Sequence, residues 1–174
     1  MTKKQELMKN LIRDGGKLLL ICMFIVLIDI PSTLSYLSHR NRAKESEAKM
    51  YVGSMNRAQQ ALFIEKSAFA TSVNALGMGI KTETENYKYS LVTTKKATFN
   101  YGVSKQKDLK SYVGGVFVIP AKKFDSNASK NKITTTSILC KADSAGTIKP
   151  PEPTNQNGKI ACPTGTVELT HRYH

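Results

Sequence analysis

The feature that most constrains this chain is an apolar run near its N-terminus, Leu18–Ile28. Eleven residues are too few to cross a hydrocarbon core of roughly 30 Å, which needs about 20 helical residues at about 1.5 Å each. Extension to Leu37 supplies the length but includes Asp29, which costs roughly 2.5–3.5 kcal/mol inside a bilayer. Each leucine or isoleucine offsets about 0.3–0.6 kcal/mol of that cost. The run predicts a membrane anchor made of Leu18, Leu19, Leu20, Ile21, Phe24, Ile25, Val26, Leu27 and Ile28.

Three interpretations of the run stay open: an uncleaved signal anchor, which we favour, a cleaved signal peptide, or a buried helix of a soluble protein. The preceding segment carries five basic residues, which favour a cytoplasmic N-terminus. The segment 32–36 that follows offers no small-x-small cleavage site. We therefore expect a cytoplasmic basic segment at 1–17, a transmembrane helix at 18–37 and an exported domain at 38–174, making a single-pass inner-membrane protein.

The net charge of +13 indicates polyanionic partners, and it is divided along the chain. Residues 1–44 carry +5 and flank the apolar run, whereas residues 45–174 carry +8. A solvated lysine-rich surface is the plainer interpretation of this second part, and no motif there indicates sequence-specific recognition. The lysines that could contact DNA or acidic polysaccharide are Lys95, Lys96, Lys105, Lys107, Lys110, Lys122 and Lys123, with Lys130 and Lys132 close by.

Residues 43–70 predict a long amphipathic helix. Apolar residues recur with a period of about 3.6, at Ala48, Tyr51, Val52, Met55, Ala58, Leu62 and Phe69. The opposite face is expected to carry Glu45, Lys49, Asn56, Gln60 and Lys66, with Glu45 and Lys49 as an i, i+4 ion pair. Gly53 weakens the helix by about 1 kcal/mol. A short helical turn is expected at 72–77, with Ser72 as its N-cap and Gly77 as its stop.

After Gly79 the apolar pattern changes to period 2. Strands are predicted at 87–92, 97–103, 115–119 and 134–140, with a short edge strand at 167–170. A helix followed by four or five strands with short turns predicts an α+β fold, with an antiparallel sheet packed on the helix.

Cys140 and Cys162 enclose a loop that is expected to have no regular structure and to need tying down. A disulfide there contributes on the order of 3 kcal/mol and requires an oxidising compartment, in agreement with export. Zinc binding is disfavoured, because the pair lacks nearby histidine or cysteine partners. Cys22 is interpreted as a thiol on the apolar run rather than a lipidation site.

The order of these features resembles a type IV pilin. The sequence segments that carry the resemblance are 43–61, 69–72, 76–89, 112–117, 138–140 and 162–165. They resemble the cyanobacterial type IV pilin-like proteins of the G/H family. The resemblance implies a protruding N-terminal helix whose second half packs on a four-stranded sheet, and assembly through those helices into pili or related export fibres.

The N-terminus differs from the family pattern, which is a Gly followed by Phe-Thr-Leu-Ile-Glu. Gly16 is present, but Lys17 stands in place of the Phe and Ile21 in place of the Glu. Pro31 lies about three residues too far from Ala43. Two interpretations follow: a divergent minor pilin, or a pilin domain on an uncleaved anchor.

The expected function is structural: a membrane-anchored minor pilin or pseudopilin whose partners are the bilayer and other pilin-like subunits. The alternative is an exported basic head that binds DNA or acidic polysaccharide without forming a fibre. No nucleophile elbow, P-loop, metal triad or dinucleotide fingerprint occurs, so we expect no enzyme, no cofactor, no metal and no small-molecule substrate.

Overall fold

A computed structural model describes residues 36, 38–123, 125–156 and 158–169. The chain divides into two units, Met1–Arg42 and Ala43–His174, and the description below concerns the second. The predicted anchor at 18–37 lies outside the described residues apart from Tyr36, so the membrane span stays a prediction. Within the described part of the chain, no helix has both the length and the apolar character that crossing a bilayer requires.

The long helix predicted from the apolar stripe is present and runs through residues 38–66. It buries Ala48, Val52 and Met55 completely, as the 3.6-residue period predicts. The helix ends earlier than expected, because Ser67 takes a positive φ of 52° and its N–H bonds to the carbonyl of Phe63. Phe69 therefore lies beyond the helix, where its ring packs 4.9 Å from that of Phe63.

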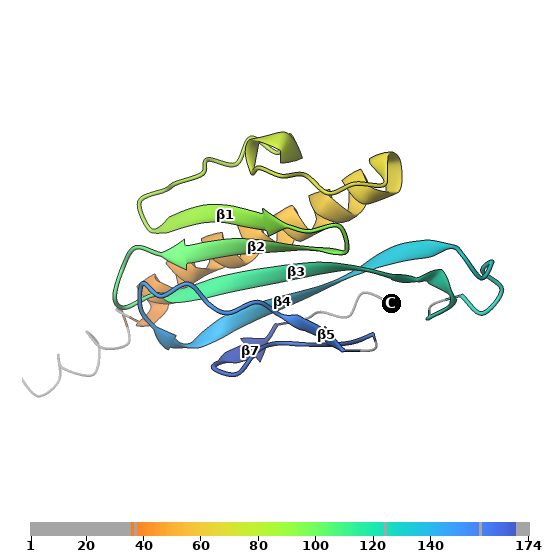
Figure 1. The fold of residues 1–174 in the computed structure, drawn as a ribbon. Helices are drawn as coiled ribbons and strands as arrows, with labels where there is room; N and C mark the ends of the chain where they lie inside the picture. Colours follow the sequence, from red (N-terminus) through yellow and green to blue (C-terminus); the bar gives the residue numbers. More distant parts are fainter. Residues whose placement is uncertain (1–35, 37, 124, 157, 170–174) are drawn as a thin grey trace, which may run out of the picture. The chain divides into compact units, whose positions relative to one another are not determined.

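Five strands form one antiparallel sheet in the order β1-β2-β3-β4-β7, as Figure 1 shows. The four predicted long strands are present as β1 (Tyr87–Thr93), β2 (Ala97–Ser104), β3 (Lys110–Pro120) and β4 (Ile133–Ala145). The predicted edge strand is β7 (Thr166–Glu168), which pairs with β4 at Cys140–Ala142. The predicted α+β class with an antiparallel sheet on a helix is confirmed.

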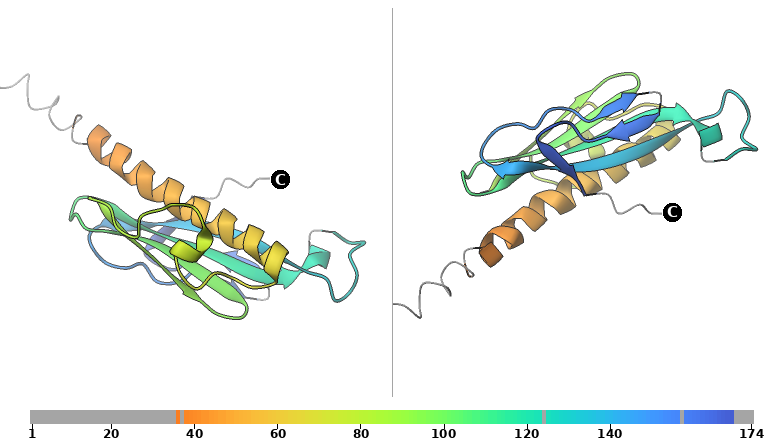
Figure 2. Two further views of the ribbon diagram at one scale, coloured as in Figure 1. Left: turned by 90° about the horizontal axis from the view of Figure 1, so that it is seen from above. Right: turned by 90° about the horizontal axis from the view of Figure 1, so that it is seen from below.

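Because every neighbouring pair is antiparallel, the turns alternate between two ends of the sheet. We call the end with helix residues 43–47 and the β2–β3 turn the near end. The far end holds the β1–β2 turn, the β3–β4 connection with its 3₁₀ turn η2 (Ala121–Lys123), and the end of the helix (Figure 1). Figure 2 shows the helix lying along one face of the sheet.

Both faces of the sheet are covered. On the helix side, Val52 and Ala48 pack against the bare backbone of Gly102 and beside Tyr89. On the other side, Phe99, Val113, Phe117 and Ile138 form a second core. Because both faces of the sheet are covered, the sequence of β3 is a nearly continuous apolar run instead of an alternation of apolar and polar residues.

The segment between the two cysteines covers that second face and is not the irregular loop that its sequence predicts. It contains a small hairpin, β5 (Thr154–Gln156) and β6 (Lys159–Ala161), joined by two residues of which Gly158 has φ 79°. The missed signal was Asn157-Gly158, a dipeptide typical of two-residue hairpin turns. The predicted disulfide between Cys140 and Cys162 is present, with a Cα–Cα distance of 5.8 Å.

The helical turn predicted at 72–77 is the 3₁₀ helix η1 (Asn74–Leu76). Gly77 ends it with φ 67°, as expected of a glycine stop. The N-cap is Val73 rather than the predicted Ser72, although the hydroxyl of Ser72 accepts a hydrogen bond from the N–H of Ala75 at 3.2 Å.

Candidate functional site

The candidate site is the helix together with the contacts that fix its orientation on the sheet. At the near end, Glu47 is the centre of these contacts. Its carboxylate accepts hydrogen bonds from the hydroxyls of Thr84 at 2.6 Å and Tyr89 at 3.0 Å, and from the amide of Asn86 at 3.4 Å. Three hydrogen bonds to one carboxylate hold the helix against β1 and the segment before it.

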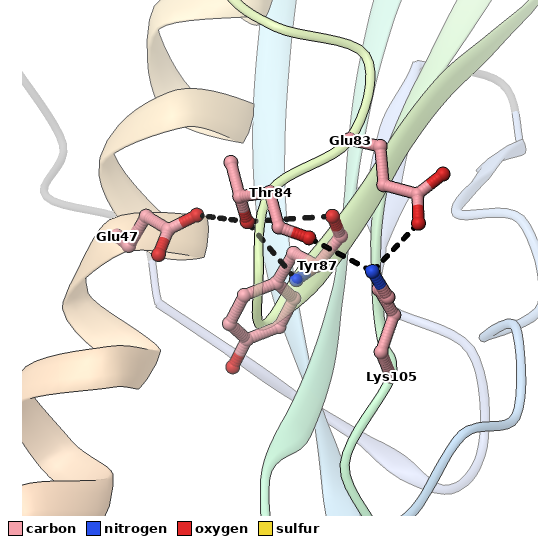
Figure 3. Close-up of polar contacts among 5 residues, drawn as sticks. All are labelled: Glu47, Glu83, Thr84, Tyr87 and Lys105. Atoms are coloured by element: carbon pink, nitrogen blue, oxygen red, sulfur yellow. Dashed lines mark hydrogen bonds and ion pairs between the residues drawn. The ribbon is translucent and has the colours of Figure 1, made fainter.

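The segment before β1 is tied to the sheet by a second set of contacts, drawn in Figure 3. Thr84 accepts a hydrogen bond from the N–H of Tyr87 at 3.1 Å. Lys105 lies 2.6 Å from the carboxylate of Glu83 and donates to the carbonyl of Thr84 at 3.0 Å. The hydrogen bond and positive charge of Lys105 lower the pKa of the Glu83 carboxyl. The pair is exposed, so it fixes the position of the segment more than it stabilises the fold.

Glu45 was predicted on the solvent face, paired with Lys49, and this prediction is wrong. Its carboxylate instead turns to β3, where it accepts hydrogen bonds from the N–H of Lys110 at 3.1 Å and the hydroxyl of Tyr112 at 3.4 Å. The signal was available in the sequence, because Glu45 lies on the same helical stripe as Ala48 and Val52. A carboxylate on an apolar stripe indicates a buried partner.

The hydroxyls of Tyr87, Tyr89 and Tyr112 act as hydrogen-bond donors in these contacts. Burial first, and then the nearby carboxylates, raise the pKa values of Tyr87, Tyr89 and Tyr112 above 10. A raised pKa keeps these phenols protonated at neutral pH, and a protonated hydroxyl can donate a hydrogen bond. The hydrogen bonds from Tyr89 and Tyr112 therefore help to fix the position of the helix on the sheet.

The middle of the helix is fixed by a polar contact that the sequence did not predict. Asn56, expected on the solvent face, is buried and donates to the carbonyl of Ile138 at 3.0 Å. Its own carbonyl accepts from the amide of Asn100 at 2.9 Å. The side chain fits because Gly114 presents bare backbone, where a Cβ would lie 2.7 Å from the Asn56 amide nitrogen.

Gln59 performs the same task one turn later. Its carbonyl accepts from the N–H of Ala70 at 2.8 Å, and its amide donates to the hydroxyl of Thr98 at 3.3 Å. It therefore ties the helix both to β2 and to the returning chain. Gln60, also expected on the solvent face, is half-buried with its amide 3.5 Å from the carbonyl of Thr135.

With the inner face fixed, one face of the helix is left uncovered. Met50, Arg57, Ala61 and Ile64 are exposed, with Met50 at 59% and Ile64 at 78%. The intervals of seven, four and three residues place them on one stripe opposite Val52 and Met55. We call Met50, Ser54, Arg57, Ala61 and Ile64 the outer helix stripe. The stripe combines two large apolar side chains and two small residues with Arg57, whose guanidinium donates to the hydroxyl of Ser54 at 2.9 Å. Exposed apolar side chains aligned in this way are typical of a surface that packs against another helix.

The lysines predicted to contact polyanions do not form one group. Lys105, Lys107 and Lys110 lie at the near end, where Lys105 contacts Glu83 and Lys110 donates to the carbonyl of Asp143 at 2.6 Å. The others lie at the far end: Lys95 and Lys96 in the β1–β2 turn, and Lys122 and Lys123 in η2. The structure therefore separates a set that the sequence treated as one.

Within the residues that the structure describes, no cluster of three histidine, cysteine or acidic side chains could hold a metal ion. The anchor residues Leu18–Ile28 lie outside these residues, so their contact with lipid stays a prediction.

A family model described as type IV pilin-like G and H matches residues 45–163. The match covers the inner contacts of the helix, all four long strands and both cysteines of the disulfide. Neither a curated protein nor a solved structure matches the chain.

Proposed function

The chain belongs to the type IV pilin-like G and H family, and from this we propose that it is a membrane-anchored structural subunit that joins other pilin-like subunits through its outer helix stripe. The observation that carries the proposal is the contrast between the two faces of the helix. The inner face is fixed by buried contacts at Glu45, Glu47, Asn56 and Gln59. The outer face leaves Met50 and Ile64 exposed at a fixed orientation.

A packing role accounts for this composition better than a chemical one. Ser54 and Ala61 allow a neighbouring helix to approach closely, while Met50 and Ile64 supply apolar area to bury. Burying a side chain of that size contributes about 1.5–3 kcal/mol. Repetition along a fibre multiplies such modest contacts, because each subunit makes several of them.

Substitution of one exposed isoleucine tests the assembly surface, and the chain offers a matched control. Ile64 is 78% exposed on the stripe, and Ile148 is 81% exposed in the segment between the two cysteines. We expect Ile64→Glu to reduce crosslinked oligomers of the full chain in its host membrane at least about tenfold, since a buried charge opposes packing. Ile148→Glu should leave them unchanged. Equal losses in both variants, or no loss in either, would refute assembly through the stripe.

We propose in addition that residues 18–37 anchor the chain in the inner membrane, with the domain from 38 onward exported. The proposal rests on the apolar run and the five basic residues before it. Mass spectrometry of the N-terminus of membrane-extracted protein tests it. An intact Met1 or Thr2 end supports an uncleaved anchor, and a start at Lys17 supports anchoring after prepilin processing. A start near Ser35 would leave no anchor and contradict the proposal.

A further inference from the structure

The two ends of the sheet carry equal numbers of lysines but very different numbers of acids. The near-end segments 43–47, 81–88, 105–110 and 141–145 contain seven lysines and six acidic residues. The far-end segments 65–68, 94–97 and 119–134 also contain seven lysines, but the only acids among them are Glu65 and Asp125. The positive charge of the domain is therefore concentrated at the far end.

Backbone hydrogen bonds hold three of the far-end lysines beside one another, although they are distant in sequence. The carbonyl of Lys96 accepts from the N–H of Val118 at 2.9 Å, two residues before β3 ends at Pro120. The carbonyl of Lys132 accepts from the N–H of Ala121 at 2.8 Å, next to Lys122. Lys95 and Lys130 are exposed in the same two connections. We call Lys95, Lys96, Lys122, Lys130 and Lys132 the far-end lysines.

We propose that the far-end lysines bind the phosphate backbone of double-stranded DNA. Phosphate contacts require positive charge in the right place and no base-reading motif, which agrees with a set made only of lysines. Double-stranded DNA carries one charge per roughly 1.7 Å of axis, a density that suits charges gathered at the ends of neighbouring strands about 4.8 Å apart. A uronate polysaccharide is the less favoured ligand, because its one carboxylate per sugar ring gives a lower charge density than that of a DNA duplex.

The local surface favours a duplex over a single strand. Non-specific binding of single strands depends on exposed aromatic rings on which bases stack. Among the described residues of the far end, the aromatic rings of Phe63, Phe69 and Phe117 are buried, and Phe124 lies outside the described residues. The large apolar side chains exposed there are aliphatic, such as Ile64 and Ile133.

The far-end lysines lie at the opposite end of the domain from Ala43. The helix leads from the near end at residue 43 to the far end at residue 66, a distance of roughly 35 Å at about 1.5 Å per residue. This binding does not require fibre assembly, since a single subunit carries the whole set.

Two triple variants of equal charge test the proposal. The far-end variant is Lys95→Gln, Lys96→Gln and Lys122→Gln. The near-end control is Lys81→Gln, Lys88→Gln and Lys107→Gln, three exposed lysines at the other end. Both retain the basic N-terminus and the same net charge, so a difference between them reports on position. The full chain in mild detergent is titrated with a labelled DNA duplex between 50 and 200 mM salt, with thermal melting as a check on folding.

If all five far-end lysines contact phosphates, affinity should fall about 500-fold over that salt range, with a logarithmic slope of about −4.5. The far-end variant should lose about 2.7 of that slope and at least about tenfold in affinity at the lowest salt, while the near-end control stays within about threefold. Absence of binding at 50 mM salt, or equal losses in both variants, would overturn the proposal. Tighter binding of polyglucuronate or of single-stranded DNA than of the duplex would overturn the choice of ligand. None of these results depends on Ile64, so failure here is separate from failure of the assembly surface.

Discussion

The contact between Asn56 and Gly114 allows the packing of helix on sheet to be tested by a double-mutant cycle. Asn56 cannot move aside, because its amide bonds to Ile138 and its carbonyl to Asn100. A methyl group at position 114 would lie 2.7 Å from the Asn56 amide nitrogen. Gly114→Ala should therefore cost about 3 kcal/mol, the upper end of the usual overpacking range, since backbone or hydrogen bonds must give way.

Asn56→Ala acts through a different loss. It removes two buried hydrogen bonds and leaves the Asn100 amide without its partner, which together cost about 2–4 kcal/mol. In the double variant the new methyl occupies the space that the amide has vacated. We expect the double variant to cost about as much as Asn56→Ala alone, a departure from additivity of about 3 kcal/mol.

Urea unfolding of the oxidised full-length chain in mild detergent, followed by far-ultraviolet circular dichroism, measures all three free energies. Gly115→Ala is the control, because its added methyl would face Phe117 and Pro153 on the opposite side of the sheet. Combined with Asn56→Ala it should be additive within about 0.5 kcal/mol. Additive behaviour of the Gly114 pair would refute the close approach of helix and sheet at this point.

Three further predictions concern stability. Gly53→Ala should stabilise the domain by about 1 kcal/mol, because alanine has a higher helix propensity than glycine and the nearest atoms to the added Cβ would be 3.9 Å away. A lower urea midpoint would contradict this. Replacing both Cys140 and Cys162 by alanine should lower the free energy of unfolding by about 3 kcal/mol, because the unfolded chain is no longer crosslinked between residues 22 apart. A decrease below about 1 kcal/mol would mean that packing alone holds the segment. Four phenols have a folded pKa above the unfolded value near 10, so stability should be intact below pH 10 and fall as the pH rises further. Their phenolate absorbance should appear together with the loss of circular dichroism, and a smooth ionisation before unfolding would contradict the burial of Tyr87, Tyr89, Tyr101 and Tyr112.

Local pattern and local chemistry predicted much of the fold from the sequence alone. The apolar period identified the helix and its buried residues Ala48, Val52 and Met55, and alternation identified the four long strands. These features depend on neighbours within a few residues, where helix and strand geometry is fixed by the backbone. The family resemblance over residues 43–167 agrees with the match over 45–163.

The predictions that failed concern groups whose partners are distant in sequence. Glu45 and Asn56 look like solvent-face residues until β3 and β4 are placed against them. Their bonds span 65 and 82 residues. The helical stripe could have shown that Glu45 faces inward, but no local rule identifies the partner of either residue. The same holds for the lysines, because the alternating turns of the antiparallel sheet decide which of them share an end.

The sequence by itself thus determined the class of fold, the family and the total charge of this protein, because composition and short-range period specify them. Only the tertiary structure decided which polar side chains of the helix, namely Glu45, Asn56 and Gln59, bond to the rest of the domain. It also decided that seven lysines meet only two acids at the far end. Both results follow from strand order and long-range hydrogen bonds, which place residues side by side irrespective of their separation along the chain.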